Sequence, residues 1–128
     1  MLNLKLIKDV VDKITKNTSD IEQLKLSNVY STEEVIIGKY FGKNLYRKTI
    51  DRGKSLSSFE HNIKNVESIF INNDHTYRVH TSGNCISLNA SGAGSYVYVN
   101  KTTVTINNTS GASPDKVYVT LEYTKTSD

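Results

Sequence analysis

The stretch "VYVTLEYT" (residues 117–124) decides the fold of this chain. Its apolar and aromatic side chains recur at every second position from Val117 to Tyr123, and this period of two predicts a β-strand with those side chains on one face. The opposite face carries Tyr118, Thr120 and Glu122. One face of the strand is therefore expected to be buried and the other to meet water.

The same period of two extends over most of the chain after residue 66. Segments rich in Gly, Asn, Ser and Asp, which close turns, separate the alternating runs. Short strands with turn signals at this spacing predict an antiparallel β-sandwich of jelly-roll type. The predicted strands span residues 66–71, 76–80, 85–88, 95–100, 103–107 and 117–124. The side chains expected in the core are Val97, Val99, Val104, Ile106, Val119 and Leu121.

A β-hairpin is predicted upstream of these strands, in "IIGKYFGKNLYRKTI" (36–50). Two short runs rich in β-branched and aromatic residues flank a tight connection, in which Gly42 is the expected positive-φ residue. The following segment, residues 51–65, is polar and irregular. It is expected to form a loop with at most one helical turn.

The hairpin contains an unbroken cationic pair, Arg47–Lys48. Strand alternation places these two side chains on opposite faces and turns Tyr46 and Ile50 inward, with the aliphatic stem of Lys48 at their edge. The pair is therefore not expected to form a cationic patch. Arg47 is predicted to lie on a solvated strand face, and the acidic partners expected on the other hairpin strand are Glu33 or Glu34.

The N-terminal segment has a different rhythm, with apolar residues at alternating steps of three and four. This a/d pattern predicts a coiled coil, with Leu4, Val11, Thr18 and Lys25 at a and Ile7, Ile14 and Ile21 at d. Isoleucine at d shifts the preference from dimers to trimers or tetramers. We therefore predict a coiled-coil stalk over residues 1–27, a β head over residues 28–128, and a homotrimer. The alternative is a single amphipathic helix that packs on its own domain.

Composition excludes several classes of protein. The chain has 128 residues, enough for one domain, and only 37% of them are hydrophobic. The net charge is +3 and the basic residues are scattered, so nucleic acid is not an expected partner. No apolar run approaches membrane-spanning length, and membrane insertion is not expected. The single cysteine, Cys85, fits synthesis in a reducing cytoplasm and is predicted to be a small buried apolar residue.

The sequence offers little catalytic chemistry. His75 and His80 flank a predicted strand, but alternation places them on opposite faces and no recognised ligand spacing is present, so no metal or other cofactor is predicted. An alternative stays open, in which one histidine meets its copies on a trimer axis and binds a metal ion. Carboxylates are few after residue 50, whereas a depolymerase needs two positioned acids on a long groove. The protein is therefore not expected to be an enzyme.

Two stretches resemble a known family. "STEEVIIGKYFGKNLYRKTI" (31–50) resembles the motif that opens the C-terminal domain of many tail-fibre and minor tail proteins of phages and prophages of Gram-positive bacteria. The ending "VYVTLEYTKTSD" (117–128) is similar to the tail on which such chains often stop. The matches cover about a quarter of the chain and bracket the β region in the right order. Tyr40 stands where the motif usually has Trp, the Asp before Gly42 is missing, and Asn44 replaces Pro.

The resemblance implies a phage tail-fibre tip, or receptor-binding head, that is made in the bacterial host cytoplasm and resides in the virion tail. Its implied partners are two further copies of itself, other phage tail or baseplate proteins, and a bacterial cell-surface polysaccharide or teichoic acid. Two alternatives remain. One is a purely structural fibre or baseplate element that caps and registers the trimer. The other is a small cell-wall depolymerase module.

Candidate ligand-binding residues follow from the chemistry of sugars, which are bound by aromatic rings and planar polar groups. The expected ligand-binding residues are Asn72, Asn73, Asp74, His75, Tyr77, Tyr96 and Tyr98. The alternative for each tyrosine is an ordinary place at the rim of the sandwich. If the ligand is teichoic acid, Arg78 or Lys101 is expected near its phosphate.

Overall fold

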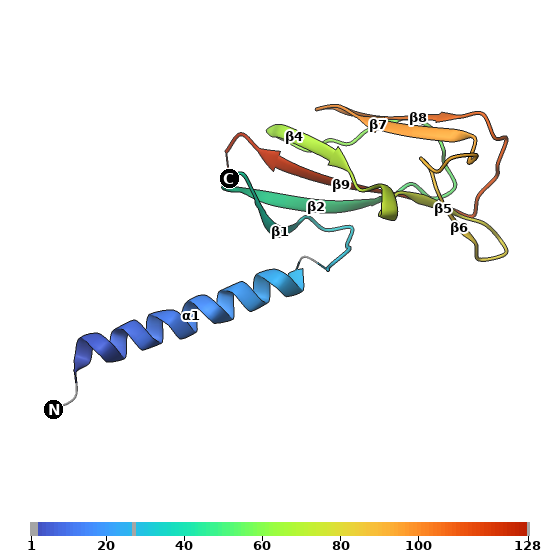
Figure 1. Cartoon of the computed structure of the whole chain (residues 1–128). Helices are drawn as coiled ribbons and strands as arrows, with labels where there is room; N and C mark the ends of the chain where they lie inside the picture. The colour runs from blue at the N-terminus through green and yellow to red at the C-terminus, as the bar shows by residue number, and fades with distance from the viewer. Residues whose placement is uncertain (1–2, 27, 128) are drawn as a thin grey trace.

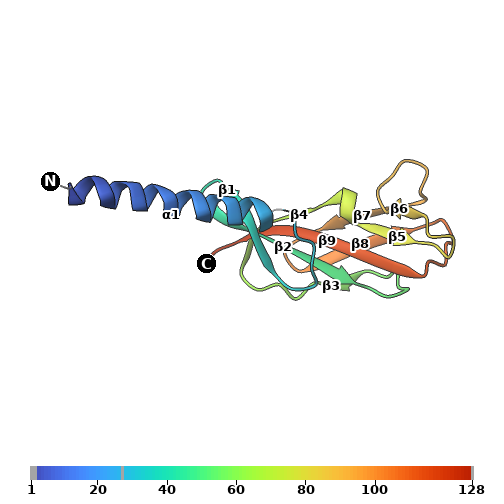
Figure 2. The same cartoon turned by 90° about the horizontal axis from the view of Figure 1, so that it is seen from below.

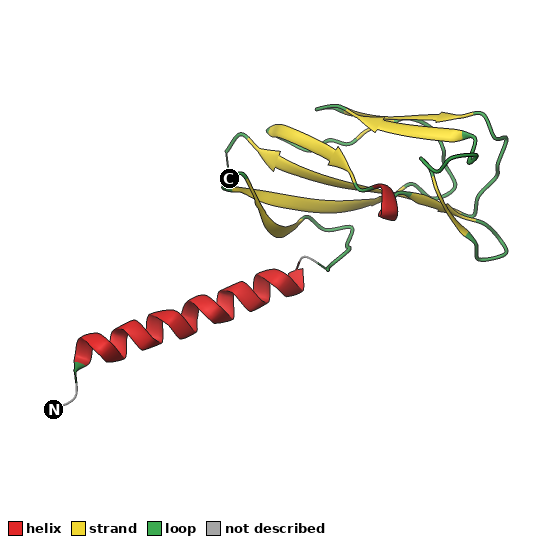
Figure 3. Cartoon of the chain, viewed as in Figure 1, coloured by secondary structure: helices red, strands yellow, loops and turns green. Residues whose placement is uncertain are grey.

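The computed structural model describes residues 3–26 and 28–127, and these residues form one N-terminal helix followed by antiparallel β-sheets (Figures 1 and 3). The mostly β fold is therefore confirmed, whereas the predicted boundary at residue 27 lies outside the described residues. The elements are α1 (Leu4–Leu26), β1 (Val35–Tyr40), β2 (Lys43–Asp51), β3 (Phe59–Glu60), β4 (Val66–Ile71), the 3-10 helix η1 (Asn73–His75), β5 (Tyr77–Val79), β6 (Cys85–Ser87), β7 (Ser95–Val99), β8 (Thr103–Asn108) and β9 (Lys116–Lys125).

Strand β9, which contains the stretch that decides the fold, organises the larger sheet. It pairs with β2 along one side, and with β4 and β5 along the other. The described strands of this six-stranded sheet follow the order β1-β2-β9-β5-β6, with β4 also beside β9. A separate three-stranded sheet has the order β3-β8-β7, and Figure 1 shows β7 and β8 lying over the strands of the larger sheet.

The hydrophobic core joins the two sheets. Val117, Val119, Leu121 and Tyr123 of β9 are all 0% exposed, as the alternation of the sequence predicts. They pack in one cluster with buried side chains of β7 and β8, which include Val97, Val104 and Ile106. Of the six predicted core residues, five are buried and Val99 is partly buried at the edge of the cluster.

The predicted hairpin is present. Tyr40 of β1 pairs with Lys43 of β2, which leaves a two-residue turn of Phe41 (φ 49°) and Gly42 (φ 80°). Two successive positive φ angles are the signature of a type I′ turn, and Gly42 takes the conformation expected of it. Tyr46 and Ile50 face the core, as predicted.

Arg47 corrects the prediction of a solvated side chain. It is only 7% exposed, and its Nε lies 2.9 Å from Oε2 of Glu122, on the neighbouring strand β9, rather than pairing with Glu33 or Glu34. The chain between α1 and β1 covers it, because Nη1 also donates to the carbonyl of Val29. Sequence alternation gives the face of a strand but not the segment that later covers that face.

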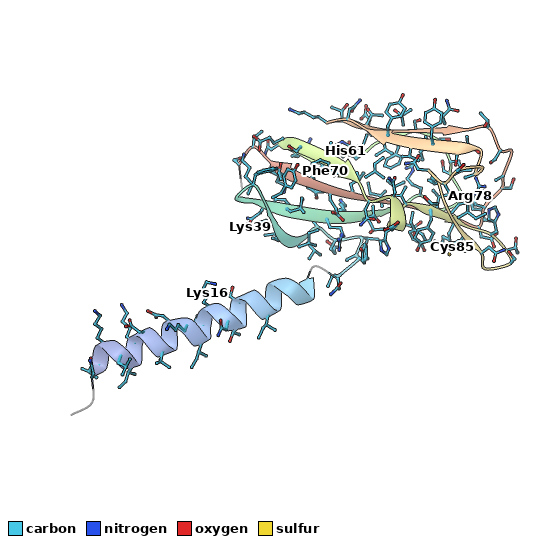
Figure 4. The ribbon with its side chains drawn as sticks, in the orientation of Figure 1. Lys16, Lys39, His61, Phe70, Arg78 and Cys85 are labelled. Atoms are coloured by element: carbon cyan, nitrogen blue, oxygen red, sulfur yellow. The ribbon has the colours of Figure 1, made fainter. Side chains whose placement is uncertain are left out.

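Two further predictions need correction. Residues 51–65 contain a short strand, β3, because Phe59 and Glu60 pair with β8, although two residues carry no detectable periodicity. Cys85 is exposed rather than buried, at the start of the edge strand β6 (Figure 4). Cys85 pairs with Val79 and Arg78 with Ile86, so the cysteine lies on the sheet face opposite to the buried Arg78.

Helix α1 begins after Asn3, whose Oδ1 accepts hydrogen bonds from the backbone N–H groups of Lys5 and Leu6 as an N-cap does. In both views it extends beyond the sheets, with only its C-terminal end beside β1 (Figures 1 and 2). Apolar a and d side chains are exposed along it, from 39% at Ile7 to 78% at Leu4. The side chain of the last predicted a residue, Lys25, lies outside the described residues. Among the described residues, no helix combines the length and apolarity needed to span a membrane.

Gly94, between β6 and β7, provides a test of local packing. Its φ is +70°, and a Cβ built there would lie 2.7 Å from Cβ and 3.0 Å from Cα of Ser110. We expect Gly94→Ala to lower the free energy of unfolding by more than the roughly 1–2 kcal/mol of left-handed strain alone. Gly92→Ala is the matched control, because Gly92 also has a positive φ (+79°) but nothing lies within 4 Å of its Cβ position. Urea denaturation measures the free energy of unfolding of both variants. Equal losses of stability in the two would show that the chain relieves the contact with Ser110 at no cost in free energy.

Candidate functional site

A hollow of about 230 Å³ lies on the outer face of the six-stranded sheet, the face turned away from the core. We call it the aromatic hollow. It is lined by Tyr30, Ser31, Thr32, Thr49, His75, Tyr77, Tyr118 and Thr120. Four separate segments of the sequence therefore contribute to it: the chain after α1, strand β2, the region of η1 and β5, and strand β9.

The floor of the aromatic hollow is set by strand register. Tyr77 and Tyr118 are direct partners across β5 and β9, and their ring centroids lie 5.4 Å apart at an interplanar angle of 45°. Thr49 and Thr120 are partners across β2 and β9, and their hydroxyl oxygens lie 2.8 Å apart. Because paired residues share a face, the sheet itself places two rings and two hydroxyls side by side.

The wall is formed by Tyr30 and His75, whose rings stack with centroids 3.7 Å apart at 28°. The guanidinium carbon of Arg47 lies 4.2 Å from the centroid of the Tyr30 ring, a cation–π contact. Arg47 is itself fixed by its ion pair with Glu122. The buried pair therefore acts as a support that holds Tyr30 over the sheet.

Hydrogen bonds fix the other side of the aromatic hollow. The hydroxyl of Thr120 donates to the carbonyl of His75 at 2.7 Å, and the hydroxyl of Thr76 donates to the carbonyl of Asn72 at 2.8 Å. The side-chain amide of Asn72 donates to Glu122 at 2.8 Å. The turn that carries His75 is thus held against the sheet by hydrogen bonds within the chain.

The lining suits an uncharged polyol. It contains four aromatic rings, from three tyrosines and one histidine, and four Ser or Thr hydroxyls, and it includes no Lys, Arg, Asp or Glu. Burial raises the pKa of the Tyr77 phenol, with further contributions from Cys85 and Tyr118, so its hydroxyl keeps its proton and remains a donor. Hydroxyls both donate and accept hydrogen bonds, and rings offer flat apolar faces.

The structure separates the seven predicted site residues. His75 and Tyr77 line the aromatic hollow, and Asn72 supports it through Glu122. Asn73 accepts a hydrogen bond from the amide of Asn89 at 2.7 Å, and Asp74 is exposed on η1.

Tyr96 and Tyr98 lie elsewhere, on β7 of the three-stranded sheet. Their rings stack with centroids 6.2 Å apart, and the two residues are 52% and 53% exposed. The hydroxyl of Tyr96 accepts a hydrogen bond from the amide of Asn107 at 2.8 Å. The two tyrosines form a small exposed ladder that is separate from the aromatic hollow.

Sequence reasoning missed Tyr30, Thr49 and Tyr118 as members of a site. The sequence carries a partial signal for Tyr118, because alternation places it on the wet face of its strand. What it does not carry is the register that sets Tyr118 beside Tyr77, or the fold of the linker that brings Tyr30 over Arg47.

The polar residues considered for metal or phosphate have other partners. No group of three His, Cys, Asp or Glu side chains suited to a metal ion occurs within residues 3–26 and 28–127. His80 accepts a hydrogen bond from Nε of Arg78 at 3.0 Å, whereas His75 stacks on Tyr30. Arg78 is 6% exposed and also donates to Ser110 and to the carbonyl of Ala93 (Figure 4). Its guanidinium is therefore engaged in holding loops together.

Comparison with known proteins assigns no family to the chain. No family model matches it, no curated protein matches it, and no solved structure matches it. The candidate site is therefore defined by its geometry and chemistry.

Proposed function

We propose that this protein is the receptor-binding head of a phage tail fibre, which binds an uncharged sugar of a bacterial surface polysaccharide without catalysis. In this proposal the two sheets form a sandwich-like head of jelly-roll type. Helix α1 joins two further copies in a coiled-coil stalk, and the assembly is a homotrimer that resides in the virion tail.

The observation that carries the proposal is the lining of the aromatic hollow. Tyr77 and Tyr118 offer ring faces, and neighbouring hydroxyls offer hydrogen bonds, with no charged group among the lining residues. The hydrogen bonds and the Arg47–Glu122 pair hold these groups in place, which lowers the entropic cost of binding.

Trimerisation would supply the affinity that a single shallow site lacks. Three linked sites can exceed one site by about 10²–10⁴ in avidity when the geometry permits simultaneous binding. The exposed apolar a and d residues of α1 support this part of the proposal, because such a stripe is stabilised by burial against other helices.

Adsorption of the labelled protein to Gram-positive cells, with and without their surface polysaccharide, tests the proposed function. We expect Tyr118→Ala to reduce adsorption by at least about tenfold, equivalent to 1.4 kcal/mol, because it removes a ring from the floor of the aromatic hollow. Tyr98→Ala is the matched control, since it removes a similarly sized ring from the other sheet. Thermal unfolding of both variants checks that the head stays folded.

Three results would contradict the proposal. Equal adsorption to stripped and intact cells would exclude a glycan. A loss in Tyr98→Ala but not in Tyr118→Ala would move the site to the tyrosine ladder of β7. Release of reducing sugar from the polysaccharide on incubation with the protein would favour the depolymerase alternative.

A second candidate function is a structural cap that registers the trimer. An exposed aromatic cluster at the hairpin favours this function. The ring of Tyr40 contacts the rings of Phe41 and Phe70 edge-on, with centroid distances of 4.7 and 5.2 Å. The Phe41 side chain is 89% exposed. Exposed aromatic groups of this kind suit contact with other protein chains. A trimer that adsorbs to no Gram-positive strain tested would support this function over receptor binding.

A further inference from the structure

The three-stranded sheet has two edges at which strand pairing stops. Its strand order β3-β8-β7 places β7 at one edge, where β8 is the only strand partner of β7 among the described residues. At the other edge β3 pairs only with Thr103 and Val104 of β8. Unpaired N–H and C=O groups along such an edge are a ready template for pairing with another chain, so proteins normally cover them.

The side-chain amide of Asn89 closes the β7 edge. Its Oδ1 accepts a hydrogen bond from the backbone N–H of Val97 at 2.6 Å, and its Nδ2 donates to the carbonyl of the same residue at 3.1 Å. In an antiparallel pair, a residue of the neighbouring strand exchanges the same two hydrogen bonds with the residue opposite. Asn89 therefore takes the place of one residue of a missing strand.

The larger sheet holds Asn89 in this position. The Nδ2 of Asn89 also donates to Oδ1 of Asn73, on η1, at 2.7 Å. The preceding residue, Leu88, is anchored on both sides, because its backbone N–H donates to the carbonyl of Thr76 at 3.1 Å and its carbonyl accepts from the hydroxyl of Ser95 at 2.8 Å. The amide thus donates both of its hydrogens and accepts one, which fixes its plane against β7.

The same arrangement recurs at the opposite edge of this sheet, beyond the two residues of β8 that pair with β3. The hydroxyl of Ser58 accepts a hydrogen bond from the backbone N–H of Ile106 at 2.9 Å and donates to the carbonyl of Ile106 at 3.4 Å. Here too one side chain binds both backbone groups of one edge residue. Both edges of the three-stranded sheet are therefore closed by side chains rather than by strands.

The β7 edge is self-complementary, so the partner it fits is a second copy of this chain. In an antiparallel pair of two β7 strands centred on Val97, each Val97 would exchange both hydrogen bonds with the other, in the places that Asn89 now fills. Tyr96 of one copy would then lie opposite Tyr98 of the other. Since these two tyrosines stack on each other and are exposed, the two tyrosine ladders would meet as one cluster of four rings.

From these observations we propose that Asn89 blocks a latent interface, the edge of β7, which would otherwise pair with β7 of a second copy of this chain. Without the amide, the N–H and carbonyl of Val97 lose their partners, and pairing with the second copy restores both hydrogen bonds. The inference concerns association between β heads. It depends neither on sugar binding nor on the stalk.

Light scattering of the full chain carrying Asn89→Ala, at increasing concentration, tests this inference. We expect the mass to reach at least about twice that of the unmodified protein at the same concentration, because a two-fold pair of edges joins two particles. Asn107→Ala is the matched control. It removes an exposed asparagine whose amide binds the hydroxyl of Tyr96 and leaves the β7 edge closed, so its mass should equal that of the unmodified protein.

A combined variant separates edge pairing from association through unfolded chains. Adding Tyr96→Lys and Tyr98→Lys to Asn89→Ala places lysines opposite one another across the proposed pair, where like charges repel, and lysine on an edge strand prevents pairing. Both tyrosines are about half exposed, so the new charges do not enter the core. We expect the combined variant to return to the mass of the unmodified protein, with its circular dichroism spectrum unchanged.

Amide hydrogen exchange of the unmodified protein gives a check that needs no variant to fold. We expect the Val97 amide to exchange at least about tenfold more slowly than an unstructured amide, since it is hydrogen-bonded although no strand lies beside it. Exchange at the unstructured rate would show that the cap is absent and would overturn the inference. A folded Asn89→Ala with unchanged mass would also overturn it. So would a combined variant that stays associated, because that association would not run through β7.

Discussion

Leu121→Ala is expected to lower the free energy of unfolding by about 2–5 kcal/mol, the usual penalty for removing a large buried side chain from a core. Leu121 is 0% exposed and lies in the middle of β9, where its backbone pairs with Lys48 of β2 and Ile71 of β4. Its side chain belongs to the cluster that joins the two sheets. Truncation leaves a cavity that two hydrogen-bonded neighbours prevent from collapsing.

Urea denaturation at one fixed protomer concentration measures this loss, because association would add to the apparent stability. Lys116→Ala, on the same strand, is the control. Lys116 forms a surface ion pair with Asp51, and such exposed pairs contribute little to stability. A loss of a few tenths of a kcal/mol for Leu121→Ala would mean that this face of β9 is not the core.

Acid should weaken the hydrogen bonds that join Glu34, directly before β1, to Tyr123 and Lys125 of β9. Partial burial raises the pKa of Glu34, but hydrogen bonds from Tyr123 and Lys125 outweigh it and hold the pKa below the ordinary value of 4.5. A carboxylate with a lowered pKa stabilises the fold above its unfolded-state pKa, and the contribution is lost as the pH falls through the folded-state value. The midpoint of acid unfolding should therefore move to higher pH in Glu34→Gln, as measured by circular dichroism.

The strands could be predicted because their signal is local. The alternation from Val117 to Tyr123 requires only that one face be buried, and β9 buries all four of those side chains. Thr120, on the face expected to meet water, is also 0% exposed, because the turn that carries His75 lies over it. The two-residue strand β3 could not be predicted in this way, since its existence depends on pairing with β8 rather than on its own residues.

The candidate site was harder to predict because it depends on non-local register. His75 and Tyr77 were expected, but Tyr118 joins them only because β5 pairs with the first half of β9 while β4 pairs with the second half. The same reason explains the error over Arg47. Its charge suggested a solvated face, whereas Glu122 of β9 and the linker at Val29 give it a buried place.

The oligomeric state is the property on which the proposed function depends most, and Ile14→Asp tests it. Ile14 is a central d residue and is 59% exposed in the single chain, so it contributes little to the folding of one protomer. In a parallel trimer its copies would meet on the axis, where three carboxylates would be desolvated and would repel one another. We expect the variant to be a monomer at micromolar concentration while the β head stays folded.

Light scattering gives the mass directly, because one chain has a mass of 14.3 kDa and the intact protein is expected near three times that value. Leu6→Asp is the matched control, since Leu6 is 61% exposed but occupies position c, outside the a/d seam. It changes the same kind of side chain in the same helix and should leave the trimer intact. A mass of one chain for the unmodified protein would contradict the prediction of a coiled-coil stalk. Equal masses for Ile14→Asp and the unmodified protein would instead place any association on the β head, where the exposed cluster of Tyr40, Phe41 and Phe70 is the next surface to test.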